Sequence, residues 1–560
     1  MNMNTEGGFS PNPVREIQRV AFKANGYSET DLKRPIVGIV NTYNESLVGH
    51  NHYHTLTDYL RRGVYRAGGV TAEFGTISIC DGMSPAHSGD FYVLPSRDII
   101  ADSVEAVARA HCLDALVLMA SCDKIVPGML IAAARLDIPC IMLIGGPMLS
   151  TIEFNGRKAD LTSYPEAIGM CQAGKISKEE LDDMTEVVCP TCGSCQFYGT
   201  ANSMCCFSEV IGMTLTGSAT IPAVYTDKKR DCVATGEAIV ELVKRGISSR
   251  RIMTLDAIKN GIMVAMATGA STNLILHTLA IAYELGYDSD EILPLFNRYS
   301  DSTPLIARIN PNADNDMEDF YKSGGIPRVM QNLASNLNMD VMTATGKTMR
   351  ENLAEYRFKY PKNERVIRPM GDPFEPTGGL VVLRGNLAPD TAVAKPSGIN
   401  PALRVFTGPA IVFESEEECT KAIEQDRVKA GDVIVIRYEG PKGGPGAREM
   451  GFPLKVLYGK GLLAKVALIT DGRFSGTNNG CFVGHISPEA AQGGPLAIVR
   501  DGDTITVDTI DKREVRIHLP DEEIAARLTR WSYEPKPLTG LLARYAKLVQ
   551  SANTGAILKI

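Results

Sequence analysis

Short apolar runs alternate with amphipathic stretches from about residue 35 of the chain onwards. Residues 55–68 and 95–111 carry apolar residues at helical spacing, and a further helix is expected after Pro127. Strands that alternate with helices predict a parallel sheet covered by helices on both faces, with ligands at the carboxyl ends of the strands. Four apolar runs predict the strands of this sheet: 34–41 (RPIVGIVN), 75–79 (GTISI), 115–120 (ALVLMA) and 140–146 (CIMLIGG).

The pattern changes twice further along the chain. Residues 230–360 are rich in helical periodicity, whereas residues 366–400 are dense in Pro and Gly. Short runs rich in Val and Ile follow, and they predict strands. We therefore expect an α/β domain over 1–375, with a parallel sheet flanked by helices, and a smaller β-rich, barrel-like domain over 376–560.

Composition and charge limit the classes of function. The 560 residues are too many for one core, and 44% hydrophobic with 22% charged residues is ordinary for a soluble globular protein. The formal net charge of −7 gives no basic footprint for nucleic acid or for an anionic membrane. The chain starts without an apolar signal segment, and thirteen cysteines, an odd number, indicate reduced thiols. A cytoplasmic protein is expected, with no membrane or nucleic-acid partner.

Cysteines stand beside aspartates at two of the predicted strand ends. The segment SCDKIVPGML sets Cys122, Asp123 and Lys124 side by side, and Cys80 and Asp81 follow the run 75–79. A buried thiol beside a surface ion pair would explain one such triplet. Two pairs at neighbouring strand ends suggest instead a soft metal centre bound by thiolates and a hard centre bound by carboxylates.

A second group of cysteines occupies CPTCGSC. Cys189, Cys192 and Cys195 are separated by two residues each, a spacing that lets thiolates converge on an iron–sulfur cluster or a zinc ion. Small buried thiols in a turn are the alternative. Cys205 and Cys206 lie in an apolar helical run and are expected to be packing residues.

Three further motifs are weak when each is taken alone. GPKGGPGAREM (440–450) carries Glu449 on a Gly-rich loop, and TDGRFSGTNNG (470–480) places Ser475 after a predicted strand. Neither has the pattern of a phosphate-binding loop, and each alone is more typical of a turn. GHNHYH (49–54) offers three histidines, for which solvated or supporting roles are favoured over zinc ligation.

Together these stretches resemble the dihydroxy-acid dehydratase and phosphogluconate dehydratase family over nearly the whole chain. The resemblance rests on CDGM, CDKIVPGM, CPTCGSCQFYGTANSM, GPKGGPGAREM and TDGRFSG, in the family's order. It implies that Cys122 and Cys195 bind an iron–sulfur cluster and that Ser475 is the catalytic base, with His87 as the alternative. It also implies a Mg²⁺ site whose ligands are Asp81, Asp123, Glu449 and a carbamylated Lys124.

The sequence departs from the family at one position of interest. Members with a [2Fe–2S] cluster carry a cysteine where this chain has Gly49. The third thiolate is therefore expected from Cys80, with Cys192 as the second choice. This pattern resembles the [4Fe–4S] branch of the family, and [2Fe–2S] is the alternative.

The resemblance implies a hydro-lyase that turns a 2,3-dihydroxy acid into a 2-keto acid. The favoured reaction converts 2,3-dihydroxyisovalerate to 2-ketoisovalerate, in valine and isoleucine biosynthesis. A sugar-acid dehydratase acting on gluconate, xylonate or 6-phosphogluconate is one alternative, and a non-catalytic iron–sulfur sensor is another. A homodimer or a dimer of dimers is expected.

Overall fold

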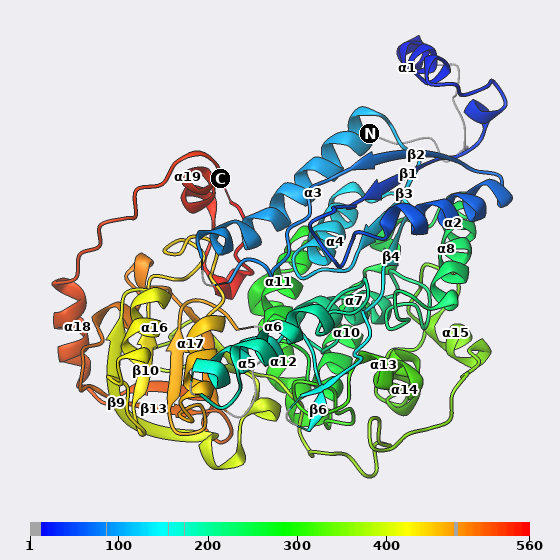
Figure 1. The fold of residues 1–560 in the computed structure, drawn as a ribbon. Helices are drawn as coiled ribbons and strands as arrows, with labels where there is room; N and C mark the ends of the chain where they lie inside the picture. Colours follow the sequence, from blue (N-terminus) through cyan, green and yellow to red (C-terminus); the bar gives the residue numbers. More distant parts are fainter. Residues whose placement is uncertain (1–12, 86, 155, 173, 475–479, 560) are drawn as a thin grey trace.

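The computed structural model describes residues 13–85, 87–154, 156–172, 174–474 and 480–559. Two sheets organise it, as Figure 1 shows: a parallel sheet at the upper right, and a larger, strongly curved sheet at the left. The predicted α/β class, with a flanked parallel sheet and a smaller β-rich, barrel-like region, is confirmed. The predicted boundary between residues 375 and 376 stays a prediction.

The N-terminal sheet has four parallel strands in the order β2-β1-β3-β4. Every residue of β1, β3 and β4 is buried, as expected for strands covered on both faces. The strands and their covering helices are β1 (Ile36–Asn41), β2 (Val70–Gly75), β3 (Ala115–Ala120) and β4 (Cys140–Ile144), with α2 (Tyr53–Arg66) packed on α8 (Thr226–Lys244) and α3 (Val93–Ala110) packed on α4 (Ile125–Leu136).

One predicted strand was wrong. Residues 76–79 are irregular, and the strand precedes them as β2, which pairs with β1 from Val70 to Gly75. The pairing ends where β1 itself ends, at Asn41, whose carbonyl accepts a last hydrogen bond from the Thr76 N–H, and Ile77 beyond it is exposed. Cys80 therefore follows an irregular segment and does not lie at the end of its strand.

A helical layer fills the region between the two sheets. The helix α11 contacts α4, and α10 contacts α7 and α12. The remaining helices and short strands up to residue 355 are α1 (Pro13–Ala24), which projects from the body, and α5 (Ser163–Gln172), α6 (Lys178–Val187), α7 (Thr200–Val210), α9 (Ser249–Ile252), α10 (Leu255–Thr268), α11 (Asn273–Leu285), α12 (Ser289–Ser302), α13 (Met317–Lys322), α14 (Gly325–Asn332), α15 (Met349–Glu355), β5 (Glu153–Phe154) and β6 (Arg157–Lys158). No described helix is long and apolar enough to cross a bilayer.

The C-terminal sheet has eight strands in the order β14-β13-β9-β10-β11-β12-β8-β7. A bridge between Arg384 and Glu514 brings its two edges together, so the barrel is nearly closed. Its elements are β7 (Val381–Leu383), β8 (Thr391–Ala394), β9 (Val405–Phe413), β10 (Val433–Ile436), β11 (Ala467–Thr470), β12 (Cys481–Ser487), β13 (Thr504–Asp508) and β14 (Glu514–Ile517), with α16 (Glu416–Glu424), α17 (Gly451–Gly459), α18 (Asp521–Thr529) and α19 (Gly540–Leu548).

Candidate metal and cluster site

The triplet Cys122, Asp123 and Lys124 lies at the carboxyl edge of the parallel sheet, between β3 and α4. The three residues are only 8%, 5% and 1% exposed, respectively. A surface ion pair, the alternative explanation of this triplet, is therefore excluded. A lysine almost never lies this deep without a functional partner or an anion beside it.

Three of the predicted cluster thiols lie close together. Burial, followed by the charges of Cys80 and Cys195, raises the pKa of Cys122 well above its ordinary value. The pKa of Cys195 is likewise raised by burial and then by Cys80. The pKa of Cys192 is raised by burial, and no other described thiol contributes to it. The thiols that act on one another thus include Cys80, Cys122 and Cys195, from three separate segments. Cys205 also raises the pKa of Cys122, and Cys189 that of Cys195.

Gly49 lies directly against this group. A Cβ atom at position 49 would stand 3.0 Å from the Cys122 Sγ and 3.5 Å from the Gly193 carbonyl oxygen. Such a contact to sulfur is tighter than most Cβ contacts, so glycine keeps the space beside the Cys122 thiol clear. Clear space beside a buried thiol that has other cysteines as neighbours is compatible with a thiolate-bound cluster.

The predicted Mg²⁺ ligands are joined through two cations. Lys124 makes a short contact with Asp123, and its Nζ lies 3.6 Å from an Asp81 oxygen. Arg473 donates to Asp81 over 2.8 Å and to Glu449 over 2.6 Å. The structure therefore brings Asp81, Asp123, Lys124 and Glu449 into one cluster, with one member from the C-terminal region.

The carboxylates of this cluster are suited to a hard cation. Burial alone would raise the pKa of Asp123, but the charge of Lys124, a hydrogen bond with Asp81 and the charge of Arg473 lower it overall. As the described side chains stand, no three His, Cys, Asp or Glu residues converge as metal ligands, because the carboxylates turn to Lys124 and Arg473. An all-oxygen donor set fits Mg²⁺. A carbamate at Lys124 would replace the opposing cation with a further oxygen ligand.

Three residues of this cluster were missed by sequence reasoning. Arg473 and Asp90 are fully buried, and Asp90 accepts a 2.8 Å hydrogen bond from the backbone N–H of Glu449. Arg473 lies within the quoted motif TDGRFSG but was not singled out. His277, on α11, has its Nε2 3.9 Å from an Asp123 oxygen. A lone histidine in an apolar helical run was the available signal for it, and Asp90 closes the stretch 79–90 (ICDGMSPAHSGD) that carries the first Cys-Asp pair.

Of the two predicted catalytic bases, Ser475 and His87, the structure describes only His87. Ser475 lies outside the described residues; the preceding carbonyl, that of Phe474, accepts a 2.7 Å hydrogen bond from Thr272. His87 is exposed, and its ring nitrogens bond locally to the Met83 carbonyl and the Gly89 N–H.

The three histidines of GHNHYH do not converge. The ring of His50 is buried and bonds to Thr42, whereas the exposed ring of His54 stacks on Tyr43. His52 is half-buried and bonds to the Gly145 carbonyl. These contacts are structural ones, as the sequence favoured.

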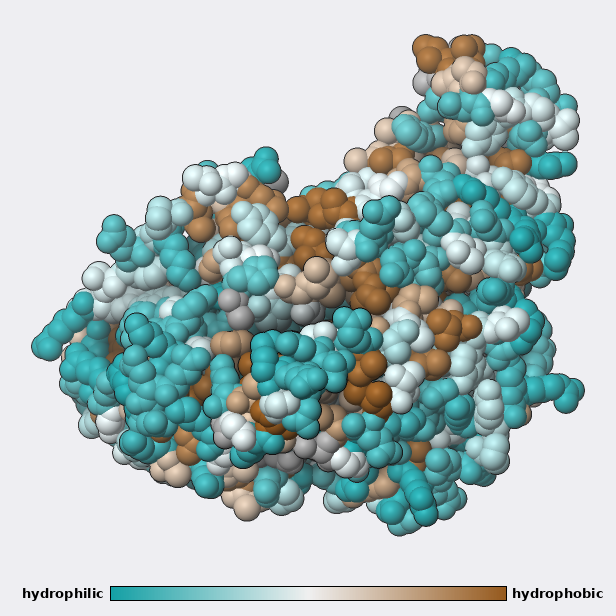
Figure 2. All heavy atoms as spheres, viewed as in Figure 1, coloured by the Kyte–Doolittle hydropathy of each residue, from teal (hydrophilic) through white to brown (hydrophobic). Residues whose placement is uncertain are grey.

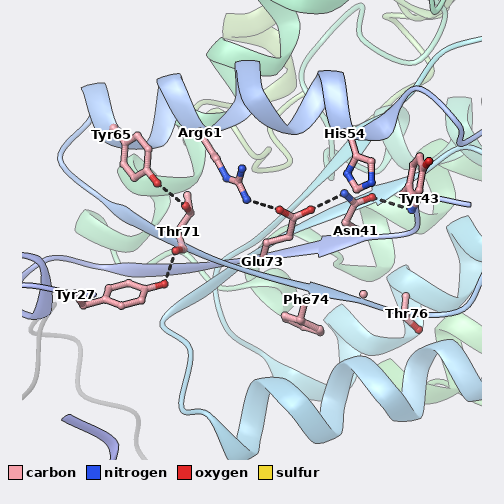
Figure 3. A pocket seen from close by; sticks show the side chains of 11 residues that line it. Tyr27, Asn41, Tyr43, His54, Arg61, Tyr65, Thr71, Glu73, Phe74 and Thr76 are labelled. Atoms are coloured by element: carbon pink, nitrogen blue, oxygen red, sulfur yellow. Dashed lines mark hydrogen bonds and ion pairs between the residues drawn. The ribbon is translucent and has the colours of Figure 1, made fainter. Parts of the chain in front are cut away.

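A pocket of about 690 Å³ opens elsewhere, between α2 and the edge strand β2 (Figure 3). Its polar side chains bond to one another: Arg61 pairs with Glu73, which accepts from Asn41, and Tyr65 bonds to Thr71. None of the predicted cluster, Mg²⁺ or catalytic residues lines it. Buried ionisable groups gather instead around Lys124 and Arg473, in the thiol and carboxylate region, a pattern typical of functional sites.

Comparison with known proteins identifies the family of the chain. The model of the dihydroxy-acid/6-phosphogluconate dehydratase N-terminal domain matches residues 34–352, and that of the C-terminal domain matches residues 365–556. A dihydroxy-acid dehydratase of Acetivibrio thermocellus is 47% identical, over 97% of this chain and 98% of its own. One of Caldicellulosiruptor bescii is 48% identical over 99% of both chains. The chain therefore belongs to the dihydroxy-acid/6-phosphogluconate dehydratase family.

Proposed function

We propose that this enzyme is a hydro-lyase that dehydrates a 2,3-dihydroxy acid to a 2-keto acid, with 2,3-dihydroxyisovalerate as its substrate. The observation that carries the proposal is similarity at 46–48% identity to proteins named dihydroxy-acid dehydratase, over nearly the full length of both chains. Asp81, Asp123, Lys124 and Glu449 are all present and are joined through Lys124 and Arg473, which supports a catalytic role over a sensor that lost its chemistry.

Two resident groups would be held by the residues that converge. Cys80, Cys122 and Cys195 would hold a [4Fe–4S] cluster, and Asp81, Asp123, Glu449 and a carbamylated Lys124 would hold Mg²⁺. When bound, these groups supply Lewis acidity toward the substrate's hydroxyl and carboxylate oxygens. The raised pKa values of the buried thiols indicate that thiolates there need a cation to be stable.

Side chains of the protein would carry out the proton transfer and hold the carboxylates in place. The reaction removes the proton from C2 and the hydroxyl from C3, which leaves as water, and the resulting enol tautomerises to the 2-keto acid. Ser475 Oγ would take the C2 proton, since its neighbour Phe474 is tied to the N-terminal half through Thr272. Arg473 would hold the carboxylates of Asp81 and Glu449, from opposite halves of the molecule, in one place.

We also propose a cytoplasmic homodimer. All thirteen cysteines are free thiols, which suits a reducing compartment. The helix α1 projects from the body, and apolar atoms show at this end in Figure 2. Ile17 and Val20 are 80% and 68% exposed, and with exposed Ala21 and Ala24 they form one stripe on the helix. Packing this stripe against a second copy would bury it.

The direct experiment is product formation. Protein purified without oxygen and loaded with iron, sulfide and Mg²⁺ is expected to form 2-ketoisovalerate from 2,3-dihydroxyisovalerate. Cys122→Ser is the matched control, because it removes one thiol from the cluster and is expected to form none. A fully loaded protein that yields no keto acid would contradict the proposal.

A further inference from the structure

His277 is a buried imidazole with no hydrogen-bond partner among the described residues. It is 0% exposed, and neither ring nitrogen makes a hydrogen bond. The buried ring of His485 differs, since its Nε2 lies 3.2 Å from Asn273 Oδ1. A buried polar group without a hydrogen-bond partner lowers the stability of the fold by about 1–3 kcal/mol, so the imidazole of His277 is destabilising at this position.

Packing does not explain a histidine at this position. Its neighbours on α11 include Ile275, Leu276 and Leu279, all buried, and α11 packs against α4, the helix that follows Lys124. An apolar side chain would satisfy these contacts without the cost. The reason for a polar ring at this position is therefore sought among its polar neighbours. One of them is the Asp123 carboxylate, which lies 3.9 Å from Nε2.

The ring of His277 can donate a hydrogen bond toward Asp123. An imidazole carries at least one N–H donor, and an ionised carboxylate only accepts. An Asp123 oxygen lies 3.9 Å from Nε2. An N–H at Nε2 therefore has this carboxylate as an acceptor.

Asp123 needs a hydrogen-bond donor once Lys124 is carbamylated. As the chain stands, Asp123 is paired with the Lys124 ammonium. A carbamate at Lys124 would remove that positive charge, and Asp123 would lose its ion pair. A closure of about 1 Å would bring Nε2 of His277 to hydrogen-bonding distance, near 2.9 Å.

We propose that His277 is a positioning residue that donates its Nε2–H to Asp123 and so orients this carboxylate as a ligand of Mg²⁺. The inference rests on the proposed function, in which Asp123 binds the metal beside a carbamylated Lys124. Carboxylates that bind metals are themselves held by hydrogen bonds, and loss of such a partner typically weakens metal affinity by about 10–100-fold.

The test is a binding titration of the full-length, cluster-loaded protein with Mn²⁺, used as a paramagnetic probe of the Mg²⁺ site, in bicarbonate buffer without oxygen. His277→Phe keeps the ring volume and removes the donor, and its dissociation constant is expected to rise by about 10–100-fold. His277→Gln restores an N–H near Nε2 and is expected within about threefold of the parent. If turnover of His277→Phe falls because metal binding is weak, its kcat should return to near the parent value at saturating Mn²⁺.

Thr278→Val is the matched control. Thr278 is the next residue of α11, is 0% exposed, and its Oγ1 also has no partner among the described residues. Its variant should bind Mn²⁺ like the parent, with the same iron content. Parent-like affinity in His277→Phe would overturn the inference, as would a His277→Gln variant as weak as His277→Phe. A parent protein that binds no Mn²⁺ would instead refute the proposed metal site itself.

Discussion

Replacing Arg473 by Met should destabilise the protein far more than loss of an ordinary ion pair. Arg473 is 0% exposed and joins Asp81 and Glu449, while Asp90, also 0% exposed, lies 3.5 Å from its Nη2. The substitution leaves the buried Asp90 carboxylate with the Glu449 N–H at 2.8 Å and the more distant Arg448 Nε at 4.0 Å.

The magnitude follows from the burial of the group left behind. Removing one member of a buried ion pair costs about 3–5 kcal/mol, because the remaining charge stays uncompensated. An additional Asp90→Asn change removes that charge, so the double variant should regain part of the loss. Arg350→Met is the control, since its pair with Asp340 leaves the side chains 60% and 72% exposed. Such an exposed pair contributes about 0–1 kcal/mol.

The assay is urea denaturation without added Mg²⁺, so that metal binding does not contribute to stability. Midpoints of the parent, Arg473→Met, Arg473→Met with Asp90→Asn, and Arg350→Met are compared at one pH. A shift for Arg473→Met no larger than that for Arg350→Met would refute the reasoning. A double variant less stable than Arg473→Met would show that the Asp90 charge is not the cause.

Four further outcomes follow from the site and its surroundings. Cys80→Ser should lose most of the iron of the anaerobically prepared protein, whereas Cys192→Ser should retain it; the reverse iron contents would make Cys192 the third ligand. Lys124→Arg keeps the charge but cannot form a carbamate, so Mg²⁺ affinity and nearly all activity should be lost, as measured by titration and turnover. Ser475→Ala should keep the cluster and Mg²⁺ but lower kcat by at least ~10²-fold and stop exchange of the C2 hydrogen with solvent. Lys395 is buried and has no hydrogen-bond partner among the residues that the structure describes, and burial lowers its pKa to about 7. Because the unfolded chain holds this proton up to the ordinary pKa of 10.5, the stability of the parent relative to Lys395→Met should rise by about 1.4 kcal/mol per pH unit between pH 7.5 and 9.5. A stability gap that is constant over this range would contradict that assignment.

Elements with strong local patterns could be predicted from the sequence. The run 115–120 became β3 with the same bounds, because six consecutive apolar residues suit a strand buried on both faces. The run 75–79 (GTISI) is also compatible with a strand but has no strand to pair with beyond its first residues, since β1 ends opposite Gly75. Whether a β-compatible segment becomes a strand depends on its partner, which local composition does not specify.

The part of the site that lies at the strand ends of the parallel sheet could be predicted from the order of strands and helices. Parallel strands end at one edge, so the placement of Cys122 and Asp123 there could be anticipated, whereas Cys80 and Asp81 reach them through an irregular segment after β2. The contact of Arg473 with Asp81 spans 392 positions in the chain and joins the barrel to the parallel sheet, and no local pattern contains it. The same holds for His277, whose helix reads as an ordinary apolar core helix until its imidazole is seen beside Asp123.

The central claim is tested most directly by comparing substrates on one anaerobic, fully loaded preparation. The panel comprises 2,3-dihydroxyisovalerate, gluconate, xylonate and 6-phosphogluconate, with kcat/KM for 2-keto acid formation measured for each in the presence of Mg²⁺. The account predicts that 2,3-dihydroxyisovalerate has the highest kcat/KM of the four. A higher value for any of the sugar acids would contradict it and assign the enzyme to sugar-acid dehydration.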